Sequence, residues 1–537
     1  MNSINTFFLA SLLFIQINAF GQVNLSKDFK VTVGTPFQVV DGPVKDYFSD
    51  GKGFTVSVKT QGEKVTVQRY DVASMKEAKR NVYEDLPDGM KIVKTLQVGD
   101  KLFYVYSSFN KKAKKDEVYA REVNMSDATL GPAKLLFTTG SEVVISGYLE
   151  GATSVFDLVG IRFSVYASFD NSKLLVQYRT KPLKKKDSEN FDVLGFYVFN
   201  TNTLDKIWGG EVQMPYTEKQ MNNLAYTVAK DGSAYMLAYL NQTKTFELLT
   251  VKPDLTIKAN KIALDANLYF QEFKLRETAD GNLSATGYYA NGIDVVVNFT
   301  GTATTSFNTN GILQFKIDPN GKILEKFNFE FPIALINQFE SKRTKEKNAK
   351  REDQGKAGIN DLKITSLFLN SDGSTTVIGE QQYVRNEMYM TSMKMIYYYG
   401  DVIATKFDKS GKLLWQKKLP KTQTGLTGKG GNGIKYIKGN GANYVLFIDN
   451  VKNANIGPDV APEKHMDGKG GFLTAYKVDD ITGDVTKHTI FDKTNINGTE
   501  AFQFKTPRIF DASDKIFLVE IYVKDKQDNM VKMELVK

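Results

Sequence analysis

The side chains best suited to catalysis are scarce in this chain. It contains two histidines, His465 and His488, and no cysteine among its 537 residues. His465 lies in "PDVAPEKHMDGKGG", near three carboxylates, and this spacing allows one metal ligand or a general base. The simpler interpretation is a histidine in a solvated loop. His488, in "VTKHTIF", is expected to be an ordinary strand residue.

Other catalytic patterns are also missing. Without cysteine there is no disulfide, no thiolate metal site and no cysteine nucleophile. No Gly-x-Ser-x-Gly nucleophile elbow and no phosphate loop ending in Gly-Lys-Ser/Thr occurs. Carboxylate pairs for glycoside hydrolysis stay open, because their separation in space is invisible in a sequence. We therefore expect no metal and no cofactor.

Residues suited to binding are concentrated in "QYVRNEMYMTSMKMIYYYG", Gln382 to Gly400. Methionine and tyrosine side chains make adaptable contact surfaces. The candidate binding residues of this stretch are Tyr383, Arg385, Met388, Tyr389, Met390, Tyr397, Tyr398 and Tyr399. A hairpin that folds over its own domain is the alternative interpretation.

A charged run, "ESKRTKEKNAKREDQGK" from Glu340 to Lys356, supplies two more candidates, Lys342 and Arg343. Their charge suits an anionic partner. Residues 333–354 are expected to contain a charged helix with Leu335, Ile336 and Phe339 on one side. A solvated linker is the alternative.

A repeated unit positions these residues. "ITSLFLNSDGSTTVIGEQQYV" and "GDVIATKFDKSGKLLWQKKLP" each contain two alternating strands around a turn, which together give a four-stranded meander, a-b-c-d. Alternation predicts a core that includes Leu367, Leu369, Val377, Ile403 and Leu414. The unit recurs along the chain, and we expect an Asp or Asn side chain to start each c-d turn by accepting backbone N–H bonds. These turns are predicted near Asp71, Asn124, Asn200, Asp254, Asp318, Asp408 and Asp479.

The last copy of the unit, "FKTPRIFDASDKIFLVEIYVKDKQDNMVKMELVK", supplies only three strands. "LSKDFKVTVG", Leu25 to Gly34, can supply the fourth and close a ring, which protects strand edges from aggregation. We therefore predict an all-β fold, a β-propeller of eight four-stranded blades whose last blade is completed by the N-terminal strand. Seven blades result if the weak first copy is not a blade.

Long connections are predicted almost entirely in the b-c and d-a classes, which share one side of a propeller. They include residues 139–160, 181–191, 290–310, 333–360, 381–399, 421–432 and 451–470. Loops on a rigid scaffold often carry function, so this side is the predicted functional surface. It is rich in lysine, from Lys111 to Lys115, Lys184 to Lys186 and in the 340–356 run. The alternative interpretation is that these lysines simply keep long loops soluble.

The N-terminus, "MNSINTFFLASLLFIQINAFGQ", has a mostly apolar run of about 14 residues, too short to span a bilayer. Ala19 and Gly21 provide small residues at −3 and −1 of a cleavage site. Residues 1–21 are predicted to be a signal peptide, and residues 22–537 a single exported propeller domain. A buried N-terminal strand is the alternative. No later run predicts a transmembrane helix, and a net charge of +9 does not imply nucleic acid.

The chain resembles secreted β-propeller proteins of the Bacteroidetes kind. The resemblance rests on "AFGQ" at the signal end and on the turns at Ile317 to Glu325 and Phe407 to Trp415. It implies a fold and a location in the periplasm, on the outer surface or outside the cell, but no activity. Quinoprotein propellers are similar at Trp415, but their repeated Trp motif is almost absent here, so no quinone is expected.

The predicted function is a non-enzymatic binding scaffold of the bacterial envelope. Its partner is expected to be a protein or a glycan, and an anionic partner would suit the lysine-rich surface. The alternative is a polysaccharide hydrolase or lyase. An enzyme should show several carboxylates converging with Tyr, Arg or Lys at the top of the channel. A third interpretation, association of the basic loops with a membrane surface, predicts salt-sensitive binding to anionic lipid.

Overall fold

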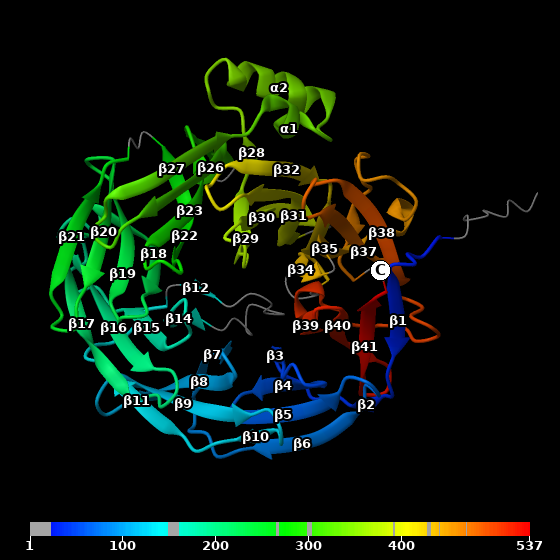
Figure 1. The fold of residues 1–537 in the computed structure, drawn as a ribbon, viewed down its shortest axis with the longest axis horizontal. Helices are drawn as coiled ribbons and strands as arrows, with labels where there is room; N and C mark the ends of the chain where they lie inside the picture. The colour runs from blue at the N-terminus through cyan, green and yellow to red at the C-terminus, as the bar shows by residue number, and fades with distance from the viewer. Residues whose placement is uncertain are drawn as a thin grey trace, which may run out of the picture.

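The computed structural model describes residues 23–145, 147–148, 160–264, 268–297, 303–389, 392–426, 431–439, 441–468 and 470–536. Its strands form eight antiparallel blades of four strands around a central axis (Figure 1). The predicted all-β, eight-bladed propeller is confirmed. The seven-bladed alternative is wrong, because the weak first copy forms a complete sheet, β3 to β6. The predicted signal peptide, residues 1–21, lies outside the described residues.

Each blade runs from an inner strand at the axis to an outer strand at the rim (Figure 1). Blade 1 consists of β3 (Val44–Ser49), β4 (Phe54–Gln61), β5 (Lys64–Asp71) and β6 (Glu77–Tyr83), and blade 2 consists of β7 (Lys91–Val98), β8 (Lys101–Asn110), β9 (Lys115–Asn124), β10 (Thr129–Leu130) and β11 (Lys134–Thr138). Blade 3 consists of β14 (Phe163–Ala167), β15 (Lys173–Arg179), β16 (Phe191–Asn200) and β17 (Lys206–Thr217), and blade 4 consists of β18 (Met221–Val228), β19 (Ala234–Leu240), β20 (Thr245–Val251) and β21 (Ile257–Ile262). Blade 5 consists of β22 (Tyr269–Glu277), β23 (Leu283–Ala290), β26 (Gly311–Ile317) and β27 (Ile323–Glu330), and blade 6 consists of β29 (Leu362–Leu369), β30 (Thr375–Tyr389), β31 (Ser392–Phe407) and β32 (Leu413–Leu419). Blade 7 consists of β34 (Lys435–Gly439), β35 (Ala442–Asp449), β37 (Phe472–Asp479) and β38 (Val485–Asp492), and blade 8 consists of β39 (Phe510–Ser513), β40 (Ile516–Val523), β41 (Gln527–Leu535) and β1 (Phe29–Val33).

Several connections contain regular structure of their own. The d-a connection after blade 5 carries two helices, α1 and α2. These additional elements are β2 (Phe37–Gln38), β12 (Gly147–Tyr148), β13 (Gly160–Ile161), β24 (Ile293–Val297), β25 (Ala303–Thr309), α1 (Ile333–Asn337), α2 (Lys342–Glu352), β28 (Ile359–Asn360), β33 (Gln423–Leu426), β36 (His465–Met466) and the short 3-10 helices η2 (Val451–Asn453) and η3 (Thr506–Arg508). None of the described helices is both long and apolar enough to span a membrane.

The core lies in layers between adjacent blades. One layer joins blades 3 and 4, where Phe196 and Leu175 meet Met236 and Leu249, all fully buried. The two central strands of a blade are covered on both faces, so they are apolar almost throughout. β19, "AYMLAYL", is buried along its whole length. Burial on both faces thus explains why apolar and polar residues do not alternate strictly along these strands.

The N-terminal strand closes the ring. β1 pairs with β41 from Phe29 opposite Leu535 to Val33 opposite Val531. Phe29 is buried and lies edge-on to Tyr444 of blade 7, with 5.6 Å between ring centroids. The predicted completion of the last blade is therefore confirmed.

The predicted turn chemistry is also confirmed. At each of the seven predicted c-d turns the Asp or Asn side chain accepts a hydrogen bond from a backbone N–H. Asp408, for example, accepts from Ser410 at 2.8 Å and from Lys412 at 3.0 Å. Both tryptophans bind the next blade through their indole N–H: Trp208 donates to Gly232 and Trp415 donates to Asp480.

We expect Phe29→Ala to lower the free energy of unfolding by about 3 kcal/mol, because it removes a buried ring from the closing strand. Urea unfolding measures this change. Lys30→Ala, at an exposed position of the same strand, should change stability by less than about 0.5 kcal/mol. Equal effects of the two substitutions would contradict the closing role of Phe29.

Candidate functional site

The connections of the blades divide between two faces of the ring. The a-b and c-d turns are short, such as residues 50–53 in blade 1 and 408–412 in blade 6. We call their side the turn face. The b-c and d-a connections lie at the opposite strand ends, and we call that side the insertion face. It carries the connections 180–190, 331–361, 420–434, 450–471 and 493–509.

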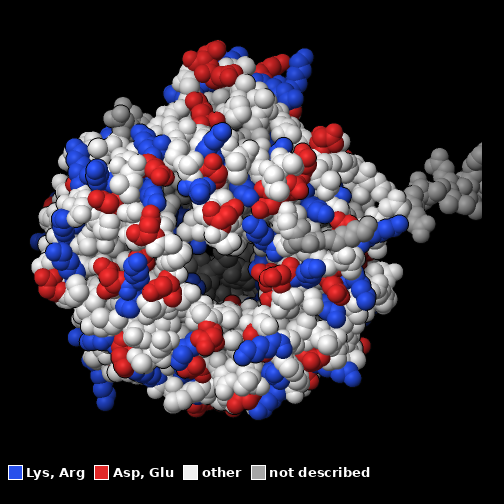
Figure 2. Space-filling view, viewed as in Figure 1, with Lys and Arg blue, Asp and Glu red and all other residues white. Residues whose placement is uncertain are grey.

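Charge alone does not mark a site on the face shown in Figure 2. That face is hollowed at the axis of the ring, and Lys and Arg side chains mix with Asp and Glu around the hollow. Within the described residues, no group of three His, Asp or Glu side chains is placed to hold a metal ion. A candidate site therefore has to be found from contacts between particular residues.

The most prominent element of the insertion face is the hairpin of β30 and β31. These strands have 15 and 16 residues, whereas their blade neighbours β29 and β32 have 8 and 7. The outer halves project beyond the blade. There β31 pairs with β33, which pairs in parallel with β36. The hairpin is thereby joined to the 450–471 connection of blade 7.

One face of this hairpin carries a preorganised stack of side chains. Tyr383 and Tyr398 lie opposite each other, with ring centroids 4.8 Å apart and planes 10° apart. The guanidinium carbon of Arg385 lies 4.8 Å and 5.6 Å from the two centroids. The Tyr398 hydroxyl donates to Glu387 at 2.5 Å. Burial, together with Glu387, raises the pKa of Tyr398 to about 12, so this phenol stays protonated at neutral pH.

The other predicted site residues are distributed differently. Alternation along β31 places Tyr397 and Tyr399 on the opposite face of the hairpin, where Lys421 lies 5.8 Å from the Tyr399 centroid. The side chains of Met388 and Tyr389, and Met390 as a whole, lie outside the described residues. Lys342 and Arg343 are exposed at the start of α2.

The charged run forms a pair of helices fixed to blade 6. The predicted helix is two helices, because Phe339 adopts a left-handed backbone conformation between them, with φ of 67°. Of the three residues predicted on the apolar side of this helix, Leu335, Ile336 and Phe339, only Ile336 is buried. Lys418 of β32, itself buried, donates to the carbonyl oxygens of Ile336 at 3.1 Å and Gln338 at 2.8 Å and pairs with Glu340. Figure 1 shows the helices at the rim of the ring.

A groove of about 360 Å³ lies between α1, β32 and blade 7. Its lining mixes polar and apolar side chains from these three elements. They are Leu335, Gln338, Gln416, Lys417, Lys418, Pro458, Asp459 and Val485.

Buried ions support the base of the hairpin. Lys421 and Glu380 form an ion pair of 2.7 Å, with both side chains 1% exposed. His465 lies nearby in β36 and is buried. Burial, with Lys493 and Lys421 close by, lowers the pKa of His465 to about 4. The expectation of a solvated loop histidine is therefore wrong, because β36 carries His465 into the sheet as a neutral residue. His488 is a strand residue as expected, bonded to Ser26 and Thr486.

A second cluster combines carboxylates, lysines and tyrosines between blades 8 and 1. Glu520 accepts from Lys59 at 2.5 Å, Lys45 at 3.1 Å and Tyr47 at 2.9 Å. Asp528 lies 3.6 Å from Lys45. These residue types match those expected of a hydrolase or lyase. The side chains of Lys59, Glu520 and Asp528 are at most 3% exposed, so a polymer cannot reach them.

The pKa values of the two carboxyls are moved in opposite directions. Burial, reinforced by the charge of Glu520, raises the pKa of Asp528 to about 7. Burial acts to raise the pKa of Glu520 too, but Lys59 and Lys45 outweigh it and lower that pKa. The cluster is therefore an ionic contact across the closing blades, in which Glu520 holds the negative charge.

Sequence reasoning missed this cluster, although a signal was present. Glu520 is the single charge in "FLVEIYV", and Lys59 is the single charge in "FTVSVKTQ". A lone charge in an apolar strand predicts a buried partner of opposite sign.

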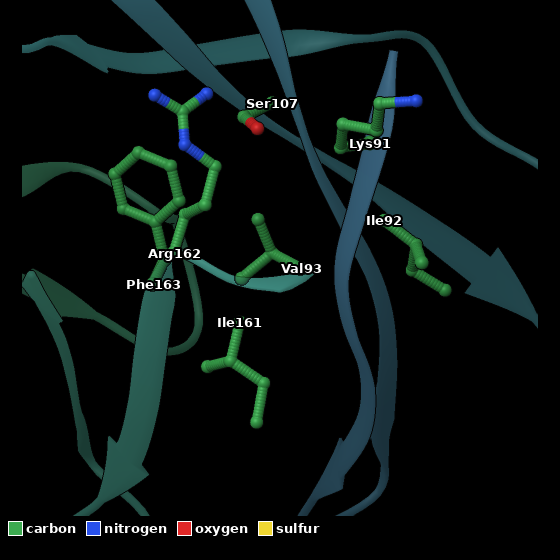
Figure 3. A pocket seen from close by; sticks show the side chains of 7 residues that line it. All are labelled: Lys91, Ile92, Val93, Ser107, Ile161, Arg162 and Phe163. Atoms are coloured by element: carbon green, nitrogen blue, oxygen red, sulfur yellow. The ribbon is translucent and has the colours of Figure 1, made fainter. Parts of the chain in front are cut away.

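A small cavity lies between the inner parts of blades 2 and 3 (Figure 3). It encloses about 10 Å³, room for a single water molecule. Arg162 at its edge makes a bidentate pair with the fully buried carboxylate of Asp116, at 2.5 Å and 2.8 Å. The cavity is thus too small for a ligand, and Arg162 joins the two blades.

No family model and no curated protein sequence matches the chain. Among solved structures it is similar to polysaccharide lyase Uly1, at 9% identity over 92% of this chain and 90% of that chain, with a TM-score of 0.39. It is also similar to a protein of unknown function from Dyadobacter fermentans, at 10% identity over 95% and 100% of the two chains, with a TM-score of 0.32. A protein of unknown function from Bacteroides caccae matches at 10% identity over 70% and 94%, with a TM-score of 0.28. Because these TM-scores lie below 0.5, the strand pairing and not these likenesses establishes the fold.

The raised pKa of Asp528 predicts a pH dependence of stability. From about pH 4 to about pH 7 the folded state keeps a proton that the unfolded state has lost, so this residue costs stability as the pH rises through that range. Asp528→Asn removes the titration. The melting temperature of the variant relative to the natural protein should therefore increase between about pH 5 and about pH 8.

Asp254→Asn is the matched control for this measurement. Bonds from Thr256 lower the pKa of Asp254, so that carboxylate stays ionised and the difference should be flat. A flat difference for Asp528→Asn as well would show that its carboxyl is not held protonated.

Proposed function

We propose that the protein is an exported, non-enzymatic binding scaffold of the bacterial envelope, and that a protein or glycan partner docks on the insertion face. The observation that carries this proposal is where exposed apolar side chains lie. Outside the blade strands of the described residues, four lie at the turn-face ends of the strands: Leu25, Phe169, Ile481 and Val536. Six lie on the insertion face, Ile145, Leu183, Val451, Val460, Met466 and Phe502, and two more, Val384 and Met395, lie in the projecting part of the hairpin on the same side. A surface that exposes apolar side chains in this way is typical of a site of interaction with a partner.

The projecting hairpin is the proposed docking platform. Tyr383, Tyr398 and Arg385 already hold one another in place, so little side-chain freedom is lost on binding. Tyrosine and arginine are also the residue types that dominate binding energy in interfaces. Flat aromatic faces suit the apolar faces of a sugar ring as well as protein side chains. The opposite hairpin face offers Val384 and Met395, 46% and 48% exposed, to the same partner.

The alternative, a polysaccharide hydrolase or lyase, needs carboxylates that a polymer can reach. The cluster with the expected composition is buried between blades 8 and 1. Glu387, beside the tyrosine stack, accepts a bond from Tyr398 and is thereby part of that stack. These observations support binding over hydrolysis. The export step rests on the predicted signal peptide.

We expect Tyr398→Ala and Arg385→Ala each to weaken binding to the envelope partner by about tenfold or more, because each removes one member of the stack. Binding is measured on immobilised envelope glycans and, separately, on envelope proteins. Both variants should melt like the natural protein, since the stack lies beyond the blade.

Phe169→Ala on the turn face is the control and should bind normally. Unchanged binding by both hairpin variants would exclude the platform. Cleavage of an envelope polysaccharide by the natural protein would replace the scaffold with the enzymatic alternative.

A further inference from the structure

We propose that the insertion face of blades 2 and 3 docks on an anionic lipid surface. The surface is formed by the β8–β9 connection, the β15–β16 connection and the segment before the β12 strand. It combines five exposed lysines with three exposed apolar side chains and is called here the basic-apolar patch. Its members are Lys111, Lys112, Lys114, Lys184, Lys185, Phe109, Ile145 and Leu183.

The β8–β9 connection is a tight turn that displays its lysines. The Asn110 side chain accepts from the backbone N–H groups of Lys112 at 3.1 Å and Ala113 at 3.0 Å. Lys114 takes the left-handed conformation, with φ of 53°, that returns the chain to β9. Phe109, directly before the turn, is 40% exposed. The turn is therefore ordered by its own backbone, and its charged side chains are left to the solvent.

The β15–β16 connection holds an apolar side chain outward. Asn190 is buried, and its side-chain oxygen accepts from the N–H groups of Leu183 at 2.9 Å and Lys184 at 3.0 Å. Its amide nitrogen donates to Glu218 at 2.6 Å. Leu183 is nevertheless 77% exposed. A buried asparagine thus positions the tip that carries Leu183 between Pro182 and Lys184.

Arg162 links the two connections. It binds Asp116, which follows the first turn, and also donates to the Val143 carbonyl at 2.8 Å. Val143 in turn pairs with Thr180 at the start of the second connection. Ile145, two residues beyond Val143, is 54% exposed. The members of the patch therefore belong to one connected framework, in which the linking residue is Arg162 (Figure 3).

The charge of the patch is mostly uncompensated. Among the described residues, none of its five lysines forms an ion pair. The nearby acids are engaged elsewhere: Asp116 with Arg162, Glu142 with Lys181 and Glu189 with Lys186. Of the three acids in the described segments 110–116 and 181–190, Asp187 is the one whose side chain forms no ion pair there. The patch therefore attracts anions.

The exposed apolar tips select lipid among anionic partners. A soluble acidic polysaccharide would neutralise the lysines but leave Leu183 and Ile145 in water. An anionic lipid surface takes both, because lysines meet the headgroups while apolar side chains enter the acyl boundary. The inference is independent of the hairpin platform, which lies on blade 6.

The test is co-sedimentation of the full-length mature chain with two kinds of vesicle, phosphatidylcholine alone and an equal mixture with phosphatidylglycerol. We expect binding only to the mixture, weakening at least tenfold as salt rises from about 0.05 M to about 0.5 M. K184E/K185E should reduce binding by more than about tenfold, because it reverses two headgroup contacts. L183S should reduce it by about tenfold at constant salt, because an apolar side chain no longer enters the lipid.

Matched controls come from the turn face. K409E/K412E makes the same charge change at two exposed lysines, and I481S removes a side chain that is 85% exposed. Both should sediment like the natural protein. The proposal is overturned if the mixed vesicles do not bind, if the turn-face variants lose binding equally, or if L183S has no effect. It is also overturned if soluble polygalacturonate binds as tightly as the vesicles, since the partner would then be a glycan.

Discussion

The structure depends on the pairing of β1 with β41. The C-terminal part of the chain supplies three strands of the last sheet, and without β1 the outer edge of β41 would be unpaired. Closure also creates the layer in which Phe29 meets Tyr444 and the ionic contact in which Lys59 meets Glu520. Apolar packing thus seals the side of blade 8 that faces blade 7, and an apolar cluster together with this ionic contact seals the side that faces blade 1. Leaving Glu520 without Lys59 would remove one of its two lysine partners inside a closed layer, which costs more than losing a surface pair.

A closed ring leaves function to what projects from it. The turn face is made of short turns, and those of the c-d class begin with Asp or Asn. The insertion face carries the hairpin of blade 6, the helices beside it and the two lysine-rich connections of blades 2 and 3. In each case buried polar groups hold the projecting part: Lys421 with Glu380 under the hairpin, Lys418 under α1 and Asn190 under Leu183. Such supports keep a surface feature in one conformation, which lowers the entropy lost on binding.

Local and periodic features could be predicted from the sequence. The Asp and Asn turns follow from a side chain that bonds its own backbone, and the blade count follows from repetition. Alternation placed Val377 and Ile403 correctly in the core. It failed for Leu414, which is 49% exposed, because the outer strand β32 turns Trp415 inward to bind blade 7. An outermost strand has one covered face, and the apolar pattern of its sequence does not indicate which face is covered.

Contacts between distant segments could not be predicted. Glu520 and Lys59 are 461 positions apart, and β36 exists only because β33 pairs with it in parallel. The burial of His465 depends on that pairing and has no local signal. The tyrosines of the hairpin were identified by composition, but the stack of Tyr383 on Tyr398 requires the strand register, which the sequence leaves undetermined.

The closing strand also imposes an order of events on the chain as it is made. β1 emerges from the ribosome first and its partner β41 last. Until β41 has been made, blade 8 cannot be completed, the faces of blades 1 and 7 that it covers have no neighbour, and β1 has no partner strand. Ring closure therefore has to wait for β41, and until then the unpaired edge of β1 is open to pairing with other chains.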